Sequence, residues 1–211
     1  MNILYVASSS RGSASYSNRV ATDVLTELRD RNPGAKVTVR DLAREPLPHI
    51  DDDFVAATRG PATSQTDEQR ALLARSDTLV DELLAADVVV IAAPMINFTI
   101  PSTLKSWVDY VARAGRTFRY SEKGPEGLVT GKQVILVVAR GGVYADAGQA
   151  LDFQVPYLKS VLGFLGMTDV TVLEVEGTAF GPDAAEKAVA AASAKLHAQC
   201  ESKLSVAAAA A

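Results

Sequence analysis

Short apolar runs alternate with longer amphipathic segments along the whole chain. The apolar runs are rich in β-branched residues and are predicted to be strands, at residues 3–7, 36–40, 88–92, 133–139 and 170–175. Three of them are almost continuously apolar, as expected for strands that are buried on both faces of a parallel sheet. The pattern therefore predicts a layered α/β protein with a parallel sheet at its centre.

The segments between the predicted strands have the apolar spacing of helices. The clearest start is the capping-box spacing of Thr66 and Gln69, and Pro101 is a favourable first-turn residue for another helix. Helices are predicted over residues 20–28, 72–84, 101–111, 151–165 and 183–199. Because strands and helices alternate without a break in composition or an internal repeat, we expect βαβ units in one domain.

Composition and charge narrow the class of protein. Hydrophobic residues make up 48% and charged residues 22% of the 211 residues, as in an ordinary folded protein. The formal net charge of −4 lacks the basic excess of a protein that holds nucleic acid through its phosphates. The single cysteine, Cys200, favours a reducing cytoplasm. We expect no membrane span or signal peptide, and residues 201–211 are expected to fray or to extend the last helix.

Candidate chemistry lies in the loops after the strands, because ligands of open α/β sheets bind at the carboxyl ends of the strands. The first loop is rich in serine and leads into a helix at residues 8–18. Unpaired N–H groups and hydroxyls at such a place can bind a phosphate, although serines also cap helices that bind nothing. Neither the G-x-G-x-x-G pattern of NAD-binding folds nor the P-loop pattern is present.

Two further loops follow neighbouring apolar runs. Residues 94–101 place Asn97 among apolar side chains between two prolines, an arrangement that suits either a planar aromatic ligand or a buried turn. The Gly141-Gly142 pair follows the next run. Its N–H groups can approach a ligand and stabilise negative charge, or the pair can simply form a turn.

No set of acid, base and nucleophile accompanies these loops. His49 and His197 lie outside them, and the chain has no G-x-S-x-G motif of serine hydrolases. The three aspartates at residues 51–53 are interpreted as a solvated helix start rather than as a metal site. The sequence therefore predicts no catalytic side chain and no metal, and it assigns the chemistry to a bound cofactor.

A series of motifs extends over residues 3–196 in a fixed order. It comprises the serine-rich first loop, residues 38–42, 92–98, 111–120 and 124–128, Arg140-Gly141-Gly142, and residues 163–166, 176–177 and 181–182. In these motifs the chain resembles the FMN-dependent NADH-azoreductases, a family of dimeric flavodoxin-like quinone and azo-dye reductases. The chain differs from the usual family pattern at Tyr16, Ile96 and Ala139, where the family often has Gln, Tyr and Ser.

The resemblance implies a flavodoxin-like, doubly wound five-stranded parallel sheet in the order 2-1-3-4-5, with helices on both faces, and a single FMN-binding domain over residues 1–200. It implies one FMN per subunit, NADH as the electron donor, quinones and azo compounds as acceptors, ping-pong kinetics and a homodimer. The FMN-binding residues that it implies are Ser9, Ser15, Tyr16, Ser17, Met95, Ile96, Asn97, Phe98, Ala139, Arg140, Gly141 and Gly142. The residues that it places at the substrate pocket are Arg59, Tyr120 and Phe164, with the two aromatic rings contributed across the dimer.

Two alternatives keep the same fold. One is a flavodoxin-like carrier that passes single electrons to partner proteins, and the other is an FMN reductase that prefers NADPH. Carriers tend to be more acidic than this chain, and ten of its thirteen aromatic residues fall at or after Phe98, which suits a roomy substrate pocket.

The chain is also longer than its sheet requires. Five βα units need about 150 residues, and most of the surplus falls at residues 41–65 and 113–131. We expect both stretches to lie beside the strand ends, to cover the cofactor and to build the dimer contact.

Overall fold

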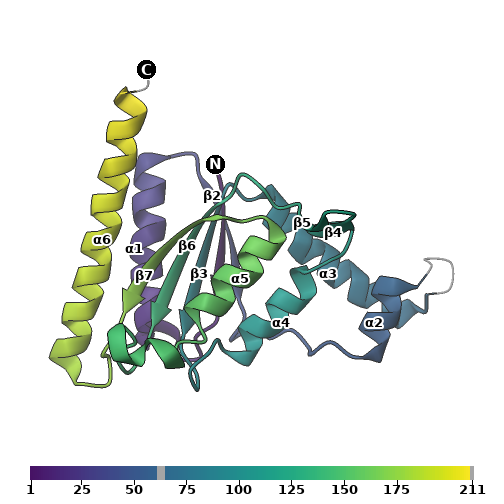
Figure 1. Cartoon of the computed structure of the whole chain (residues 1–211), viewed down its shortest axis with the longest axis horizontal. Coiled ribbons are helices and arrows are strands. Elements are labelled where there is room, and N and C mark those ends of the chain that lie inside the picture. Colours follow the sequence, from purple (N-terminus) through teal and green to yellow (C-terminus); the bar gives the residue numbers. More distant parts are fainter. Residues whose placement is uncertain (61–64, 210–211) are drawn as a thin grey trace.

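A five-stranded parallel sheet forms the centre of the protein in a computed structural model that describes residues 1–60 and 65–209 (Figure 1). The strands are β1 (Asn2–Ala7), β2 (Lys36–Asp41), β3 (Val88–Pro94), β6 (Gln133–Ala139) and β7 (Asp169–Val175). Their order in the sheet is β2-β1-β3-β6-β7, which is the expected order 2-1-3-4-5 when the strands of this sheet are numbered along the chain. The flavodoxin-like fold and all five predicted strands are therefore confirmed.

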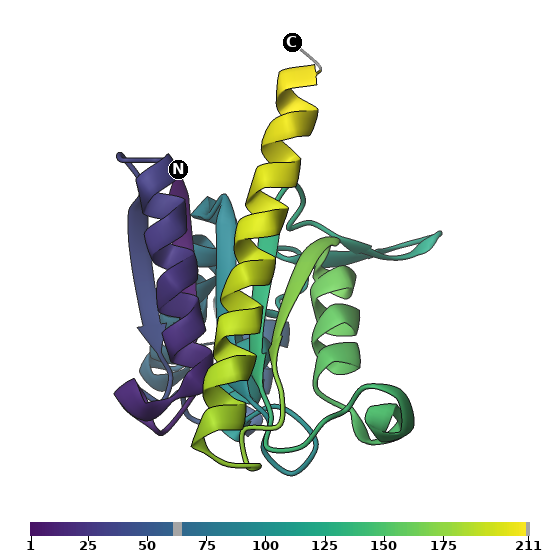
Figure 2. The same ribbon diagram turned by 90° about the vertical axis from the view of Figure 1, so that its left-hand side faces the viewer.

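Helices cover both faces of the sheet, as expected. On one face α1 (Tyr16–Arg31) and α6 (Pro182–Ala209) pack on alternate residues of the strands, and on the other face lie α3 (Asp67–Ala85), α4 (Ser102–Val111) and α5 (Val155–Leu165). The short α2 (Asp52–Arg59) packs beside α3. Figure 2 shows α1 and α6 together on the face turned toward the viewer. Among the helices that the structure describes, none has the length and apolarity needed to cross a membrane.

Helix ends follow their capping chemistry. The predicted capping box is present, because the Thr66 hydroxyl accepts from the Gln69 N–H and the Gln69 side chain accepts from the Thr66 N–H, both at 3.2 Å. Asp51 accepts from the Phe54 N–H at 2.9 Å and caps α2, so this part of the aspartate run starts a helix. Pro101 is the N-cap of α4 rather than its first helical residue.

Two helices differ from their predicted ranges. Of the segment predicted at residues 151–165, only Val155–Leu165 forms the helix α5, and Leu151 ends the preceding 3₁₀ turn, η3 (Asp146–Leu151). The Asp152 carboxylate accepts from the backbone N–H groups of Gln154 and Val155 at 2.9 and 3.1 Å, so it interrupts the helix and starts a new one. The last helix continues beyond residue 199 to Ala209.

The stretch at residues 113–131 forms an antiparallel hairpin of β4 (Phe118–Ser121) and β5 (Gly124–Gly127). It connects the end of α4 to the start of β6, and Figure 2 shows it projecting from the body of the molecule, away from the carboxyl ends of the strands. The expectation that this stretch lies beside the strand-end loops of its own chain is therefore wrong, because α4 has already returned the chain to the amino ends. Residues 61–64 of the other stretch lie outside the described residues.

Tyr5 makes the stability of the fold sensitive to alkaline pH. It belongs to the core beneath α1 and α6, and burial, with a smaller effect of the Asp41 charge, raises its pKa from 10.0 to about 12. Because the pKa is higher in the folded state, this stabilisation is complete below pH 10 and is lost as the pH rises toward about 12. At pH 11 we expect the free energy of unfolding to be about 1 kcal/mol lower than at pH 9 because of Tyr5. The Tyr5→Phe variant is expected not to show this loss. Urea unfolding of both proteins at pH 9 and pH 11 measures it, and an equal loss in both would contradict the assignment.

Candidate functional site

The carboxyl ends of β1, β3 and β6 lie side by side because these strands are neighbours in the sheet. Two backbone hydrogen bonds join the first residues of these loops to the neighbouring strands: the Ser8 N–H donates to the Ala92 carbonyl of β3 at 3.1 Å, and the Met95 N–H donates to the Ala139 carbonyl of β6 at 2.7 Å. The loop residues expected around a cofactor therefore gather at one edge of the sheet, below the strands in Figure 1.

The first loop leads into α1 through a cap made by Ser15. The Ser15 hydroxyl accepts from the Asn18 N–H at 3.3 Å and lies 3.0 Å from the Ser17 hydroxyl. Both serines and Ser9 are buried. Within residues 1–60 and 65–209, the N–H groups of Tyr16 and Ser17 have no acceptor, as is usual in a first helical turn. These N–H groups and the positive end of the helix dipole form a site for an anion.

Two arginines add positive charge beside the start of α1. The guanidinium carbons of Arg11 and Arg19 lie 5.5 and 5.7 Å from the centre of the Tyr16 ring, within the range of cation–π contact. Arg19 forms a two-pronged ion pair with Glu186, at 2.7 and 2.8 Å. Arg11 has no carboxylate partner in the described part of the chain, so its charge is available to an anion.

The second loop contains a strained turn. Asn97 and Phe98 have φ angles of 46° and 73°, and no other described residue except glycine has a positive φ. Ile96 and Thr99 close the turn with mutual backbone hydrogen bonds of 2.9 and 3.1 Å. Left-handed geometry is costly for a bulky residue such as Phe98, and strain of this kind clusters at ligand sites. The turn therefore marks this loop as a candidate ligand contact.

A hollow of about 480 Å³ lies beside the strained turn. It is lined by Ile96, Asn97, Thr99, Ile100, Ser102, Lys105 and Tyr157. Burial raises the pKa of the Tyr157 hydroxyl, which the charge of Lys105 opposes, so the phenol is neutral at physiological pH. Lys105 is itself held by Asp109 at 2.6 Å. The hollow therefore offers mostly apolar walls to the flat part of a ligand.

The third loop presents N–H groups and uses its carbonyls internally. The carbonyls of Arg140, Gly141 and Gly142 accept from the N–H groups of Thr178 at 3.1 Å, Ala179 at 3.1 Å and Gly177 at 2.9 Å, respectively. The N–H groups of Gly141 and Gly142 have no acceptor among the residues that the structure describes. They are therefore available to an acceptor on a ligand, while the Arg140 residue, 2% exposed, contributes its backbone rather than its side chain.

Arg59, Tyr120 and Phe164 form a second group, away from these loops. Arg59 and Tyr120 line a hollow of about 380 Å³ between α2, the end of α4 and the hairpin. The ring of Phe118 lies 4.6 Å from that of Phe164 and 5.6 Å from that of Tyr120. Because Tyr120 is on the hairpin and 75% exposed, the structure brings these three residues together but not to the strand-end loops of the same chain.

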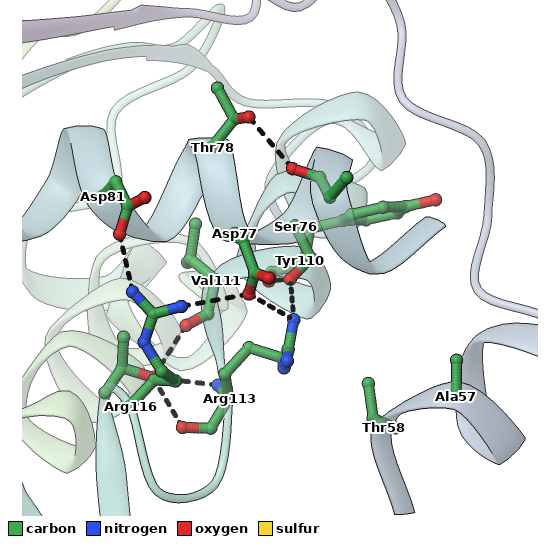
Figure 3. A network of polar contacts seen from close by, with 12 residues as sticks. Ala57, Thr58, Ser76, Asp77, Thr78, Asp81, Tyr110, Val111, Arg113 and Arg116 are labelled. Carbon is green, nitrogen blue, oxygen red and sulfur yellow. Dashed lines mark hydrogen bonds and ion pairs between the residues drawn. The ribbon is translucent and has the colours of Figure 1, made fainter. Parts of the chain in front are cut away.

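A polar network fixes the base of the hairpin to α3 (Figure 3). Arg113 donates to the Ser76 hydroxyl at 2.6 Å, and that hydroxyl donates to the Tyr110 carbonyl at 2.6 Å. The Asp77 carboxylate lies 3.3 Å from Arg113 and 3.0 Å from Arg116. Burial lowers the pKa of the Arg113 guanidinium, and Asp77 counteracts this shift. The hairpin is therefore held at a fixed place on the body of the protein.

The sequence did not point to the residues that surround Arg140, namely Asp152, Gln154 and Glu176. A signal was present, because an arginine at the end of a buried apolar strand needs carboxylate or amide partners. The sequence does not show which of the 25 acidic residues lie within reach.

Comparison with known proteins identifies the family to which the chain belongs. A family profile described as "Flavodoxin-like fold" matches residues 1–200. An FMN-dependent NADH:quinone oxidoreductase of Mesorhizobium japonicum is 50% identical over 210 residues, which is 99% of this chain and 100% of that protein. FMN-dependent NADH:quinone oxidoreductase 1 of Rhizobium etli is 53% identical over 197 residues, 93% and 97% of the two chains. The crystal structure of an azoreductase from Bacillus anthracis matches with a TM-score of 0.86 at 32% identity, over 93% of this chain and 96% of that one. The chain therefore belongs to the flavodoxin-like family that contains these FMN-dependent NADH:quinone oxidoreductases and azoreductases.

Proposed function

We propose that this enzyme takes two electrons from NADH and passes them, through bound FMN, to quinones and azo compounds. The observation that carries the proposal is a row of N–H groups at one edge of the sheet that have no acceptor among the described residues. Tyr16 and Ser17 begin α1 after the first loop, and Gly141 and Gly142 lie in the third loop. The loop that contains the strained turn follows β3, the strand between the two that these loops follow. FMN has a phosphate at one end and a flat ring with hydrogen-bond acceptors at the other, which suits such a row. The names of the relatives, which include FMN and NADH, support the same cofactor and donor.

Each loop has a separate part in this proposal. The hydroxyls and N–H groups of Ser9, Ser15, Tyr16 and Ser17 hold the phosphate, with the helix dipole adding to the attraction. The turn made by Met95, Ile96, Asn97 and Phe98 contacts the ring and the ribityl chain. Ala139, Arg140, Gly141 and Gly142 lie at the pyrimidine edge of the ring, where the two glycine N–H groups stabilise negative charge that develops on reduction.

When bound, FMN supplies the redox chemistry by accepting a hydride from NADH and giving two electrons to the acceptor. The side chains are then needed to bind, to orient and to exclude water, and none has to act as a nucleophile. Because donor and acceptor use the same pocket in turn, we propose ping-pong kinetics.

We also propose that the working unit is a homodimer. Arg59, Tyr120 and Phe164 lie together but apart from the strand-end loops of their own chain. Apolar side chains are exposed at both places, including Tyr120 on the hairpin and Phe98 and Phe153 beside the strained turn. A second copy that sets its hairpin over these loops buries both surfaces and completes the pocket, which a single chain cannot do.

The proposal also includes the extent of the FMN-binding domain and the compartment in which the enzyme acts. We propose that residues 1–200 form one FMN-binding domain, because the family match covers this range, and that residues 201–211 lie outside it. The single cysteine favours a reducing compartment, and we propose that the enzyme acts in the cytoplasm.

The proposal is tested on the purified protein loaded with FMN. We expect a yellow protein with one FMN per subunit that bleaches on anaerobic addition of NADH and regains its colour with a quinone. Initial rates at varied NADH and quinone concentrations are expected to give parallel reciprocal plots. Absence of NADH oxidation with a quinone would contradict the proposal. Turnover that needs a partner protein would favour the electron carrier, and faster bleaching by NADPH would change the donor.

A further inference from the structure

Arg140 carries a buried positive charge at the end of β6. Its side chain is 1% exposed, although the residue stands directly before the two glycines whose N–H groups face the candidate site. Burial of a charge is unfavourable unless the charge is paired and its hydrogen-bond donors are satisfied. The position of the guanidinium therefore depends on its partners.

The partners of Arg140 come from two separate parts of the chain. The guanidinium donates to the Gln154 side chain at 3.1 Å, to Asp152 at 2.9 Å and to Glu176 at 2.9 Å. Glu174 lies farther away, at 3.6 Å. Asp152 and Gln154 stand before α5, whereas Glu174 is the next-to-last residue of β7 and Glu176 follows that strand. The guanidinium thus joins the start of α5 to the end of β7.

The same partners reach the backbone of the candidate site. The Gln154 amide donates to the Ala93 carbonyl at 3.1 Å, near the end of β3. The Glu176 carboxylate accepts from the Tyr144 N–H at 2.9 Å, at the far end of the glycine loop. Arg140 is therefore linked through Gln154 to the loop that contains the strained turn and through Glu176 to its own loop.

We infer that Arg140 is a positioning residue. Held by Asp152, Gln154 and Glu176, its guanidinium fixes the loop that presents the Gly141 and Gly142 N–H groups. Its positive charge also balances the two carboxylates that lie near those N–H groups. The inference rests on the proposed function for its effect on FMN, but the ordering of the loop does not depend on a ligand. The side chain of Arg140 does not touch the cofactor in this proposal.

The charges in this cluster predict that two substitutions shift the reduction potential of bound FMN in opposite directions. Asp152 and Glu176 both lie 2.9 Å from the single guanidinium, so loss of Arg140 leaves two partly buried carboxylates without their cation. The added negative field disfavours the extra negative charge of a reduced flavin, and the Arg140→Met variant is expected to lower the reduction potential of bound FMN. Asp152→Asn removes a negative charge at the same place, keeps an acceptor oxygen, and is expected to raise that potential.

The ordering of the loop is tested first, on flavin-free protein. Hydrogen exchange followed by mass spectrometry is expected to show faster exchange over residues 140–144 in Arg140→Met than in the natural protein. Arg140→Lys keeps the charge, but its single nitrogen cannot reach all three partners that the separate guanidinium nitrogens contact, so it is also expected to exchange faster there. Arg40→Met is the matched control, because Arg40 pairs with Glu82 on the edge strand β2 and lies outside the site. Unchanged exchange over residues 140–144 in both Arg140 variants would overturn the inference.

The effect on the cofactor is then measured by FMN titration and by the reduction potential of the bound flavin. Loss of alignment of two N–H donors is expected to raise the FMN dissociation constant roughly tenfold in Arg140→Met. If Arg140→Met does not fold, Asp152→Asn and Arg140→Lys carry the test. Potentials that move in the same direction in Arg140→Met and Asp152→Asn, or an Asp152→Asn potential that does not rise, would overturn the role of charge. If the natural protein binds no FMN, the proposed function fails while the exchange result still decides the role of Arg140 in ordering the loop.

Discussion

Replacement of Ser15 by aspartate is expected to abolish FMN binding at micromolar concentrations and to leave the fold intact. Aspartate caps helices as well as serine does, so the first turn of α1 keeps the acceptor that Ser15 offers to the Asn18 N–H. The new carboxylate lies at the place proposed for the phosphate. Two charges about 5 Å apart repel by about 3 kcal/mol at an effective dielectric constant of 20, which corresponds to a rise in the dissociation constant of roughly a hundredfold.

The matched control is Ser15→Asn, which has nearly the same shape as aspartate, caps helices equally well and carries no charge. We expect it to bind FMN far more tightly than Ser15→Asp, with similar melting temperatures for the two variants. Quenching of FMN fluorescence gives the affinities, and circular dichroism gives the melting temperatures. Equal FMN affinity in the two variants would show that the phosphate does not lie at the start of α1.

The second large effect is expected from Gly127→Ala in the hairpin. A methyl group at Gly127 would lie 2.2 Å from the Gly166 nitrogen and 2.4 Å from the Leu165 carbonyl carbon, and both are backbone atoms at the end of α5. Since neither can move as a side chain can, the hairpin has to shift and takes Tyr120 with it. Overpacking of this kind costs about 1–3 kcal/mol, and a shift of about 1 Å in a substrate-contacting group can lower turnover by up to roughly a hundredfold.

Gly163→Ala is the control for this change, since Gly163 lies in α5, where an added methyl group meets no atom of another segment within 4 Å. We expect it to keep full quinone reductase activity and to gain helix stability. Gly127→Ala is expected to lose most of its quinone reduction while its FMN affinity changes little, because the strand-end loops are untouched. A Gly127→Ala protein with normal turnover would contradict the place assigned to the hairpin.

Mixed dimers of the two variants test whether the hairpin acts on the partner. When Ser15→Asp and Gly127→Ala subunits are co-expressed, each heterodimer contains one intact set of FMN loops facing one intact hairpin. We therefore expect more activity than either variant shows alone. If the pocket is completed within one chain, both subunits of the heterodimer are defective and no activity returns.

Much of the fold could be predicted from local pattern. The five strands and the capping box of α3 follow from β-branched apolar runs and from the spacing of Thr66 and Gln69, because a strand buried on both faces and a capped first turn are local requirements. The break at Asp152 could not be predicted in this way. That carboxylate accepts from the backbone N–H groups of Gln154 and Val155 at the start of α5 and also pairs with Arg140, which stands in a separate segment of the chain.

The candidate site, like the fold, could be predicted only in part from the sequence. The first loop could be located because it follows a strand and starts a helix, and the Gly141-Gly142 pair because it ends another strand. The strain at Phe98 could not be foreseen, since a left-handed φ in a bulky residue arises only where surrounding contacts impose it. Arg140 was expected among the FMN-binding residues, and the sequence did not show that its side chain is buried among Asp152, Gln154 and Glu176.

Residue type and spacing along the chain were enough to predict the order of strands and helices and the three loops of the candidate site, and a resemblance of motifs pointed to the family. Contacts in the folded protein settle which loop N–H groups lack an acceptor among the described residues and how Arg140 is neutralised. They also place the hairpin, which carries Tyr120, away from the loops of its own chain. Each of these depends on contacts between segments far apart in the sequence. The direction in which α4 returns the chain to the amino ends of the strands is what separates the hairpin from those loops.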